Sequence, residues 1–516
     1  MTGQNQTNQS YPDIPEDQFQ FATDREIRFD EAPGTKARSY FEDALIRFRK
    51  NASSVAAAWI LLFLVLFAIF APILSPYSIK DSDKTYTSYP PYISFLARRG
   101  ISLFGGTKIY DSQNDKAMLF WRGIAEETGR NPVIKTVKTY RTSVRQRGRQ
   151  VERCTYDIRV NAYYALGMVY KVFSEKEFKK IQAWQDQTKI QVIYPYVYPK
   201  DINDIRDNPN LWYRLDENGS ARLDEDGNFI PVYANHKEDA GAPYHSLRID
   251  GDDGSYIYSM EKSGAVQCRV DYYNYYQYKH GREPFYIFGT SAMGLDLFGA
   301  IGYGARFSLL FAVLVASINM VIGIVYGSIQ GYYGGAVDMA LDRISDILSG
   351  MPFIVVATLF QIHLAQKVGV VVSFLFAFVL TGWIGVAALT RKQFYRFKGL
   401  EFVLAAKSLG ASDARIMFRH ILPNAAGTLV TSCALVIPAV ISSETALSYL
   451  GIVDLSGLTG TTLGTLLSQG SATATTAPHT ILWPSVFLGL LMISFNLFGN
   501  GLRDAFNPTT RGMEDV

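Results

Sequence analysis

Two stretches in the second half of this chain constrain its fold more than any other feature, because they lack the charges that a water-facing segment carries. Val368 to Thr390 holds no Asp, Glu, Lys or Arg, and in Ala425 to Tyr449 only Glu444 is ionisable. At 1.5 Å per residue, a helix of about 20 residues crosses a hydrocarbon core of about 30 Å. Both stretches are therefore predicted to span a membrane as α-helices.

Charge asymmetry predicts how the spans are oriented. The loop from Arg391 to Arg419 holds seven Lys or Arg and two acids, whereas the segment from Ile452 to His479 holds no Lys or Arg. Because basic loops stay in the cytosol, the first loop is predicted to be cytosolic, the second external and both termini cytosolic. The predicted spans are residues 55–75, 306–331, 341–365, 369–390, 424–450 and 480–501.

The spans divide the chain into four regions. No cleavable leader is predicted in the polar N-terminal region, and its basic end at Arg47, Arg49 and Lys50 predicts a signal anchor. The net charge of +3 does not indicate nucleic-acid binding. The regions are a cytosolic tail (1–50), a first transmembrane helix (51–76), an extracytoplasmic insertion (77–287) and a core of five transmembrane helices (288–510) with a cytosolic loop at 391–423.

A polar segment at 400–424 separates these two predicted spans. Helix formers run from Phe402 to Leu409, Gly410 stands where a left-handed C-cap is expected, and Ser412 is placed to cap a second helix. Pro423 is predicted to end that second helix before the next span. We therefore expect a helix–turn–helix, here called the cytosolic knob, that docks a soluble partner.

The insertion is predicted to be an α+β domain. The segment around Cys154 alternates like a half-buried strand, and the Ser174–Glu177 capping box opens a helix. Further strands are predicted at Lys189–Val197, Ser255–Met260 and Ala265–Tyr273.

Two acidic tips of the insertion, Asp216–Gly219 and Asp224–Asn228, bring carboxylates close together. Neither supplies the twelve-residue frame ending in Glu that a calcium-binding loop requires, and turn chemistry explains the Asp and Gly there and at Asp250–Gly254. Hairpin tips are therefore favoured over calcium sites. No metal or cofactor site is predicted.

Two further features of the insertion leave alternatives open. Cys154 and Cys268 pair only if the fold brings them together in an oxidising compartment. A tyrosine run is interpreted as a strand with alternate rings packed inward, the alternative being a platform for a solute-binding protein or lipid headgroups. The run comprises Tyr272, Tyr273, Tyr275, Tyr276 and Tyr278.

Residues of the knob resemble the signature loop of binding-protein-dependent ABC importer permeases. The recurring positions are Ala405, Ala406, Gly410, Leu422 and Pro423. The resemblance implies that the first short helix couples the spans to an ATPase subunit, although Leu404 replaces the usual Glu. The implied coupling residues are Phe402, Ala405, Ala406, Lys407, Gly410, Ala411, Ser412 and Asp413.

Residues 40–76 and 286–510 resemble the C-type permease of oligopeptide and dipeptide importers, with its type I six-helix fold. Ser291, Leu295 and Ala388 replace charged residues of the family pattern. The insertion is usually far shorter in that family. The matching positions include Gly289, Thr290, Arg306, Asp338, Asp342, Arg343, Asp346, Pro352, Arg391, Glu444 and Asn507.

Three of these charged residues are candidates for the translocation path or a contact between subunits. Arg343 and Asp346, three residues apart, are expected to offset each other's charge. Glu444 is the one acid deep in a late span, where a charge is costly. A polar lining or subunit contact and a position near the outer interface are equally compatible with Glu444.

The chain lacks a Gly-x-x-x-x-Gly-Lys-Ser/Thr phosphate loop, so it is expected to be no enzyme and to depend on separate ATPases. The resemblance implies a bacterial inner-membrane subunit that forms a heterodimer with a homologous permease. It also implies two ATP-binding subunits and a solute-binding lipoprotein or periplasmic protein. Nickel, heme or glycoside cargo, a secondary transporter and a membrane-anchored receptor are the alternatives to peptide import.

Overall fold

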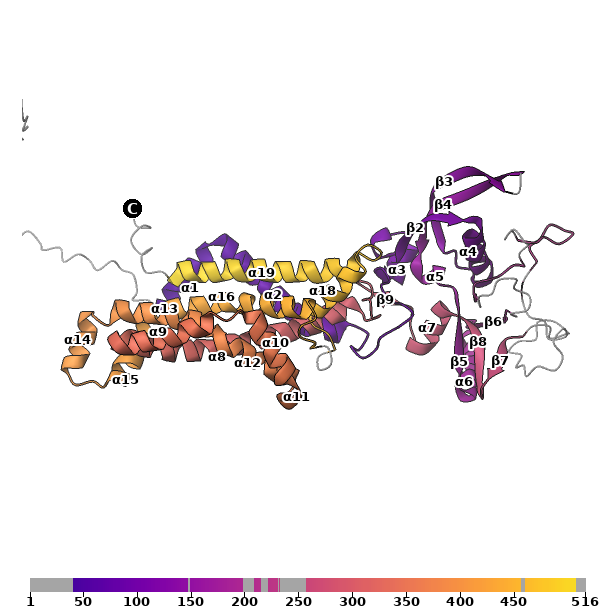
Figure 1. The fold of residues 1–516 in the computed structure, drawn as a ribbon. Coiled ribbons are helices and arrows are strands. Elements are labelled where there is room, and N and C mark those ends of the chain that lie inside the picture. The colour runs from indigo at the N-terminus through magenta and orange to yellow at the C-terminus, as the bar shows by residue number, and fades with distance from the viewer. Residues whose placement is uncertain are drawn as a thin grey trace, which may run out of the picture.

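The computed structural model consists of a long bundle of α-helices and a smaller head of strands and short helices (Figure 1). The head is formed by the chain between the first and second long helices of the bundle, so the chain leaves the bundle once and returns to it. The structure describes residues 40–146, 149–197, 208–214, 221–230, 232, 257–455 and 460–506.

The long helices of the bundle are apolar over most of their length and lie side by side (Figure 1). A short π-helical stretch, Ile416–Ile421, joins two of them. The helices are α1 (Tyr40–Lys50), α2 (Ala52–Leu74), α8 (Leu297–Tyr333), α9 (Gly335–Ser349), α10 (Phe353–His363), α11 (Ala365–Val368), α12 (Val370–Gly382), α13 (Ile384–Phe397), α14 (Glu401–Ser408), α15 (Asp413–Arg415), α16 (Leu422–Tyr449), α18 (Leu463–Ala472) and α19 (His479–Phe506).

Five of the six predicted spans correspond to helical stretches that are long and apolar enough to cross a membrane. The third, predicted at 341–365, is instead the pair α9 and α10, bent by 75° at a short break. Pro352 lies in that break and has no N–H to continue the helix, which explains the bend. The count of six therefore holds among the described residues only if the bent pair is one span.

Small residues let the helices of the bundle approach closely. A Cβ added to Gly327 of α8 would lie 2.3 Å from the carbonyl oxygen of Ala387 in α13, too near for any side chain. Lipid offers helices no hydrophobic drive to associate, so such close packing is a main source of their attraction. Gly327 therefore fixes how near α8 and α13 lie.

The head contains three small antiparallel sheets, with strand orders β1-β9, β2-β4-β3 and β5-β8-β6, and β7 also pairs with β8. Helices pack around the sheets (Figure 1). Its elements are β1 (Tyr92–Ile93), α3 (Ser94–Arg98), η2 (Ser102–Phe104), β2 (Thr107–Asn114), α4 (Asp115–Thr128), β3 (Val133–Gln146), β4 (Arg149–Asn161), α5 (Ala162–Ala165), β5 (Met168–Phe173), α6 (Glu175–Thr188), β6 (Ile193–Tyr194), β7 (Ser259–Lys262), β8 (Ala265–Asp271), α7 (Tyr272–His280) and β9 (Phe285–Tyr286).

Several predicted elements of the head are present. The alternating segment around Cys154 is strand β4, and Ser174 caps α6 by accepting a hydrogen bond from the Glu177 N–H at 3.2 Å. The predicted strand at Lys189–Val197 is reduced to the two residues of β6. The strand predicted at Ser255–Met260 begins only at Ser259, its first two residues lying outside the described part of the chain.

The tyrosine run is not a strand, as predicted, but helix α7. Helical spacing buries Tyr272, Tyr273 and Tyr276, which are 1–3% exposed. They belong to a core cluster of eight buried tyrosines, so these three rings have no free surface for a binding protein or lipid. The cluster comprises Tyr77, Tyr86, Tyr92, Tyr163, Tyr272, Tyr273, Tyr276 and Tyr286.

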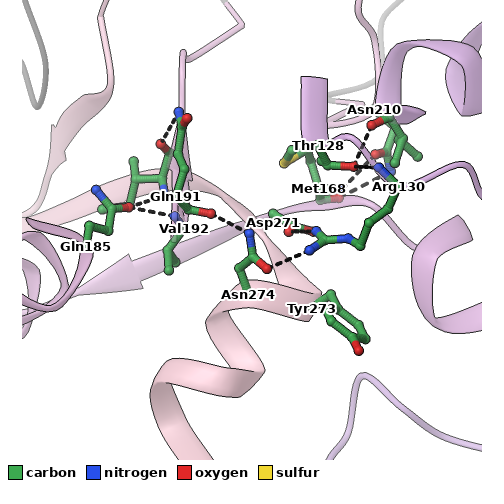
Figure 2. A network of polar contacts seen from close by, with 12 residues as sticks. Thr128, Arg130, Met168, Gln185, Gln191, Val192, Asn210, Asp271, Tyr273 and Asn274 are labelled. Carbon is green, nitrogen blue, oxygen red and sulfur yellow. Dashed lines mark hydrogen bonds and ion pairs between the residues drawn. The ribbon is translucent and has the colours of Figure 1, made fainter. Parts of the chain in front are cut away.

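A polar network inside the head joins the segment after α4, the end of β8, helix α7 and the segment before β6 (Figure 2). The Arg130 guanidinium pairs with the Asp271 carboxylate and donates to the side-chain oxygen of Asn274 at 2.7 Å. Asn274 donates in turn to the carbonyl oxygen of Gln191 at 2.6 Å. Burial raises the pKa of the Asp271 carboxyl, and Arg130 opposes that rise.

The head is fastened to the bundle by backbone contacts just before α8. The Asp83 N–H donates to the Gly294 carbonyl at 3.0 Å, and the Ser88 N–H donates to the Ser291 carbonyl at 2.9 Å. Tyr272 of α7 donates its hydroxyl to the Asp83 carboxylate at 2.6 Å. The same segment therefore contacts both the tyrosine core and the start of the second long helix.

Candidate functional site

The cytosolic knob projects from one end of the bundle as helix α14 (Figure 1). Gly410 follows the helix with φ +80°, and its N–H donates to the Lys407 carbonyl at 3.0 Å. The Ala411 N–H donates to the Ala406 carbonyl at 3.1 Å. This pair of bonds is the Schellman motif, so the predicted left-handed cap at Gly410 is confirmed.

Helix α14 has one face packed on the bundle and one face open. Val403 packs in a buried cluster with Phe394 of α13 and Ile416 of the π-helical stretch, and Ala406 is also buried. Phe402, Leu404 and Leu409 are 40%, 52% and 87% exposed. An exposed apolar face on an otherwise anchored helix is typical of a protein docking surface.

The second half of the knob differs from the prediction. Pro423 does not end a helix there, because α15, the π-helical stretch and α16 form one continuous helix from Asp413 to Tyr449. The Leu422 N–H donates five residues back to the Met417 carbonyl, so π-helical bonding carries the helix into Pro423. Ser412 occupies the N-cap position, but its side chain makes no capping hydrogen bond.

Two side-chain bonds tie the knob to the C-terminal end of α8. The Tyr332 hydroxyl donates to the Asp413 carboxylate at 2.6 Å. The Lys398 ammonium, just before α14, donates to the Gly331 carbonyl at 3.0 Å. The knob is therefore connected to α8 as well as to the helix that begins at Asp413.

Arg391 makes a contact that the sequence analysis missed. Its guanidinium, on α13, reaches Asp338 at 2.6 Å and Asp342 at 2.8 Å, both on α9, and Tyr395 donates to Asp338 at 2.7 Å. The four-residue spacing of the two acids places them on one helix face. This spacing was the signal in the sequence that a basic partner lies opposite. Only the fold shows that Arg391 lies opposite that face.

The predicted pair of Arg343 and Asp346 is confirmed, with a nitrogen-to-oxygen distance of 3.2 Å. Both side chains lie on the exposed side of α9, at 76% and 59% exposed. An exposed pair of this kind contributes little to stability. The two residues therefore remain candidates for contacts outside the chain.

Glu444 is fully buried between helices of this chain. Ser308 of α8 donates to its carboxylate at 2.8 Å, and Ser448 and Thr445 donate at 3.2 and 3.3 Å. Ser308 and Ser448 lie toward the head-side ends of α8 and α16. This agrees with the alternative position predicted for Glu444, near the extracytoplasmic interface of the membrane. Glu444 thus holds helices of one subunit together.

The remaining candidates in the head are structural. Cys154 and Cys268 are free thiols on β4 and β8, strands of separate sheets, so the suggested disulfide is absent. The tip at Asp224–Asn228 is a hairpin turn, in which the Asp224 carboxylate accepts from two backbone N–H groups. Asp216–Gly219 and Asp250–Gly254 lie outside the described residues.

Relatives of this chain are membrane components of transport systems. The oligopeptide transport system permease protein OppC of Bacillus subtilis is 37% identical over 43% of this chain and 72% of its own length. The Escherichia coli K12 protein of the same name is 38% identical over 44% and 74%. An inward-facing MetNI methionine ABC transporter chain is 16% identical, over 40% of this chain and 96% of that one, with a TM-score of 0.33.

Two family models match the parts of the chain that form the bundle. Residues 39–91 match the N-terminal TM domain of oligopeptide transport permease C. Residues 287–512 match the binding-protein-dependent transport system inner membrane component, which leaves 92–286 between the two matches. This integral membrane protein of the bacterial inner membrane therefore belongs to the family of binding-protein-dependent transport permeases, as a relative of the oligopeptide permease C proteins.

Proposed function

We propose that this chain is one of two permease subunits of an ATP-driven importer whose cargo is an oligopeptide or a dipeptide. The names of its relatives, oligopeptide and dipeptide permeases at 35–39% identity, support this cargo. The chain lacks a phosphate-binding loop, so separate ATPase subunits hydrolyse the nucleotide. A homologous permease and a solute-binding protein complete the assembly.

The geometry of α14 is the observation that carries the coupling role. Its apolar outer face docks in a cleft of an ATPase subunit, and its inner face is fixed to the ends of α13 and α16. The bond from Tyr332 to Asp413 extends the connection to α8. Closure of the ATPases thus moves three helices together and rocks the bundle between its two openings.

The orientation follows from charge. The basic loop that carries α14 lies in the cytosol, as do both termini, and the α+β head between residues 77 and 287 lies outside the membrane. Six crossings result when α9 and α10 count as one bent span. The head is therefore on the side from which a solute-binding protein delivers cargo.

Replacing Gly410 by Pro tests the coupling role. Proline cannot adopt φ +80° and removes the N–H that bonds to Lys407, so the cap of α14 is lost while the spans keep their sequence. We expect normal membrane insertion, loss of ATPase co-purification and loss of ATP-dependent peptide uptake into proteoliposomes. Gly399→Ala is the matched control, because its new methyl group points into open space.

Uptake at the control level in Gly410→Pro would contradict the coupling role of the knob. The cargo is tested separately with the unmodified transporter. Labelled di- and oligopeptides should compete with each other for uptake, and nickel, heme or a glycoside should not compete. Competition by one of these solutes instead of peptides would contradict peptide cargo and leave the coupling result unchanged.

A further inference from the structure

A short segment of the head, Ser94 to Phe104, exposes apolar side chains to its surroundings. It contains helix α3 and the turn η2 and connects strands β1 and β2. Phe95, Ile101 and Leu103 are 57%, 44% and 65% exposed. Three large apolar side chains on eleven residues are unusual for a surface in contact with water alone.

The segment lies beside the end of the first membrane-spanning helix. A groove of about 490 Å³ runs between them and is lined by Leu74, Pro76, Ser94, Arg282, Glu283 and Phe285. Leu74, the last residue of α2, is 69% exposed, as is Ile73 before it. The lipid-facing surface of α2 therefore continues through the groove to the first residue of α3.

Polar contacts hold the segment in this place. Arg98 of α3 pairs with Glu283, next to Arg282, whose guanidinium donates to the Pro76 carbonyl at 2.8 Å. Pro76 follows α2 by two residues, so α3 is linked to the end of the span. Figure 1 shows α3 at the end of the head that faces the helices.

The charge of the segment points to an anionic partner. Residues 94–104 contain Arg98 and Arg99 and no acid. Arg98 is paired with Glu283, whereas the exposed Arg99 lies over the Phe95 ring at 4.1 Å. A cation beside exposed apolar side chains is the composition of segments that lie in the headgroup layer of a membrane.

We infer that Ser94 to Phe104 is an interfacial anchor. It lies in the membrane–water interface on the extracytoplasmic side of the membrane that the bundle spans. Phe95, Ile101 and Leu103 enter the acyl boundary, and Arg99 pairs with lipid phosphate. The anchor holds the head against the leaflet and limits its tilt relative to the bundle. The inference rests on the membrane-spanning helices and is independent of the cargo.

Spin-label accessibility tests the anchor in the full chain. A nitroxide is attached to Leu103→Cys, in a background of Cys154→Ser, Cys268→Ala and Cys433→Ala, in vesicles of phosphatidylethanolamine and phosphatidylglycerol. Leu223→Cys is the matched control, because Leu223 is similarly exposed at 55%. Its hairpin packs on α4, on the side of the head away from the helices (Figure 1).

At Leu103 we expect collisions with oxygen to exceed those with a water-soluble nickel chelate, and at Leu223 we expect the reverse. Equal chelate access at the two sites would overturn the anchor. Protection of Leu103 from both reagents would also overturn it and would assign the surface to a neighbouring permease subunit. Ile101→Cys provides an independent labelling site. Gel filtration of the detergent-solubilised variants checks folding, because a folded variant elutes as the unmodified protein does.

Discussion

The bundle and the head bury their cores in different ways. The main core of the bundle consists of aliphatic residues, alanines and phenylalanines, with Glu444 held inside by hydroxyl groups. One core cluster of the head consists of eight buried tyrosines, and some of their hydroxyls bond to each other, as Tyr276 does to Tyr286 at 3.0 Å. A tyrosine core suits a domain in water, because each ring gives apolar area while hydroxyls such as that of Tyr272 find a partner.

The two regions also differ in how they use an arginine. Arg130 of the head is 21% exposed and pairs with Asp271, which is 3% exposed. Arg391 of the bundle is 28% exposed and joins Asp338 and Asp342 of α9. Water reaches the second site more easily, so the loss of Arg391 should cost less than the loss of Arg130.

Replacing Arg130 by Gln should have the largest effect on stability. It leaves the Asp271 carboxylate buried without its partner, a change that costs about 3–5 kcal/mol in folding free energy. Thermal unfolding and limited proteolysis of the head measure the loss. Lys179→Gln, which breaks an exposed pair with Glu175, should cost less than about 1 kcal/mol.

The double variant Arg130→Gln with Asp271→Asn distinguishes an unpaired charge from lost packing. We expect it to be more stable than Arg130→Gln alone. Equal stability of the single and double variants would mean that the ion pair is not what holds the head together, and the contrast with Arg391 would fail.

Replacing Gly327 by Ala should have the second largest effect, confined to the bundle. The new Cβ would lie 2.3 Å from the backbone oxygen of Ala387, so α8 and α13 must move apart at a cost of about 1–3 kcal/mol. Thermal denaturation in detergent measures the cost. The control Gly385→Ala, also on this helix pair, adds a methyl group in open space, and an equal loss there would refute the close-approach argument.

Replacing Arg391 by Gln should have the smallest effect of the three, about 1–2 kcal/mol, since two partly exposed ion pairs are lost. Peptide uptake should fall as well, because α9 and α13 lose their link near the knob. Arg343→Gln, which breaks only the exposed pair with Asp346, serves as the control. Identical losses in the two variants would remove the distinction between Arg391 and an ordinary surface charge.

Local patterns in the sequence were sufficient for the features that depend on neighbouring residues. The length of the apolar stretches located five spans, because inside lipid a helix must pair its own backbone N–H and carbonyl groups. The glycine at 410 marked the end of α14, because few other residues adopt a positive φ. The strand around Cys154 and the cap at Ser174 were predicted for the same local reasons.

The sequence by itself determined the membrane spans, the position of the knob and the family, since each is written in composition, spacing or motif. Only the tertiary structure decided the helix made by the tyrosines, the free cysteines, and the burial of Glu444 against Ser308. Contacts between residues far apart in the chain depend on how elements pack, which no local pattern specifies. For that reason Arg391 could be recognised as a motif residue, but its bridge to Asp338 and Asp342 could not.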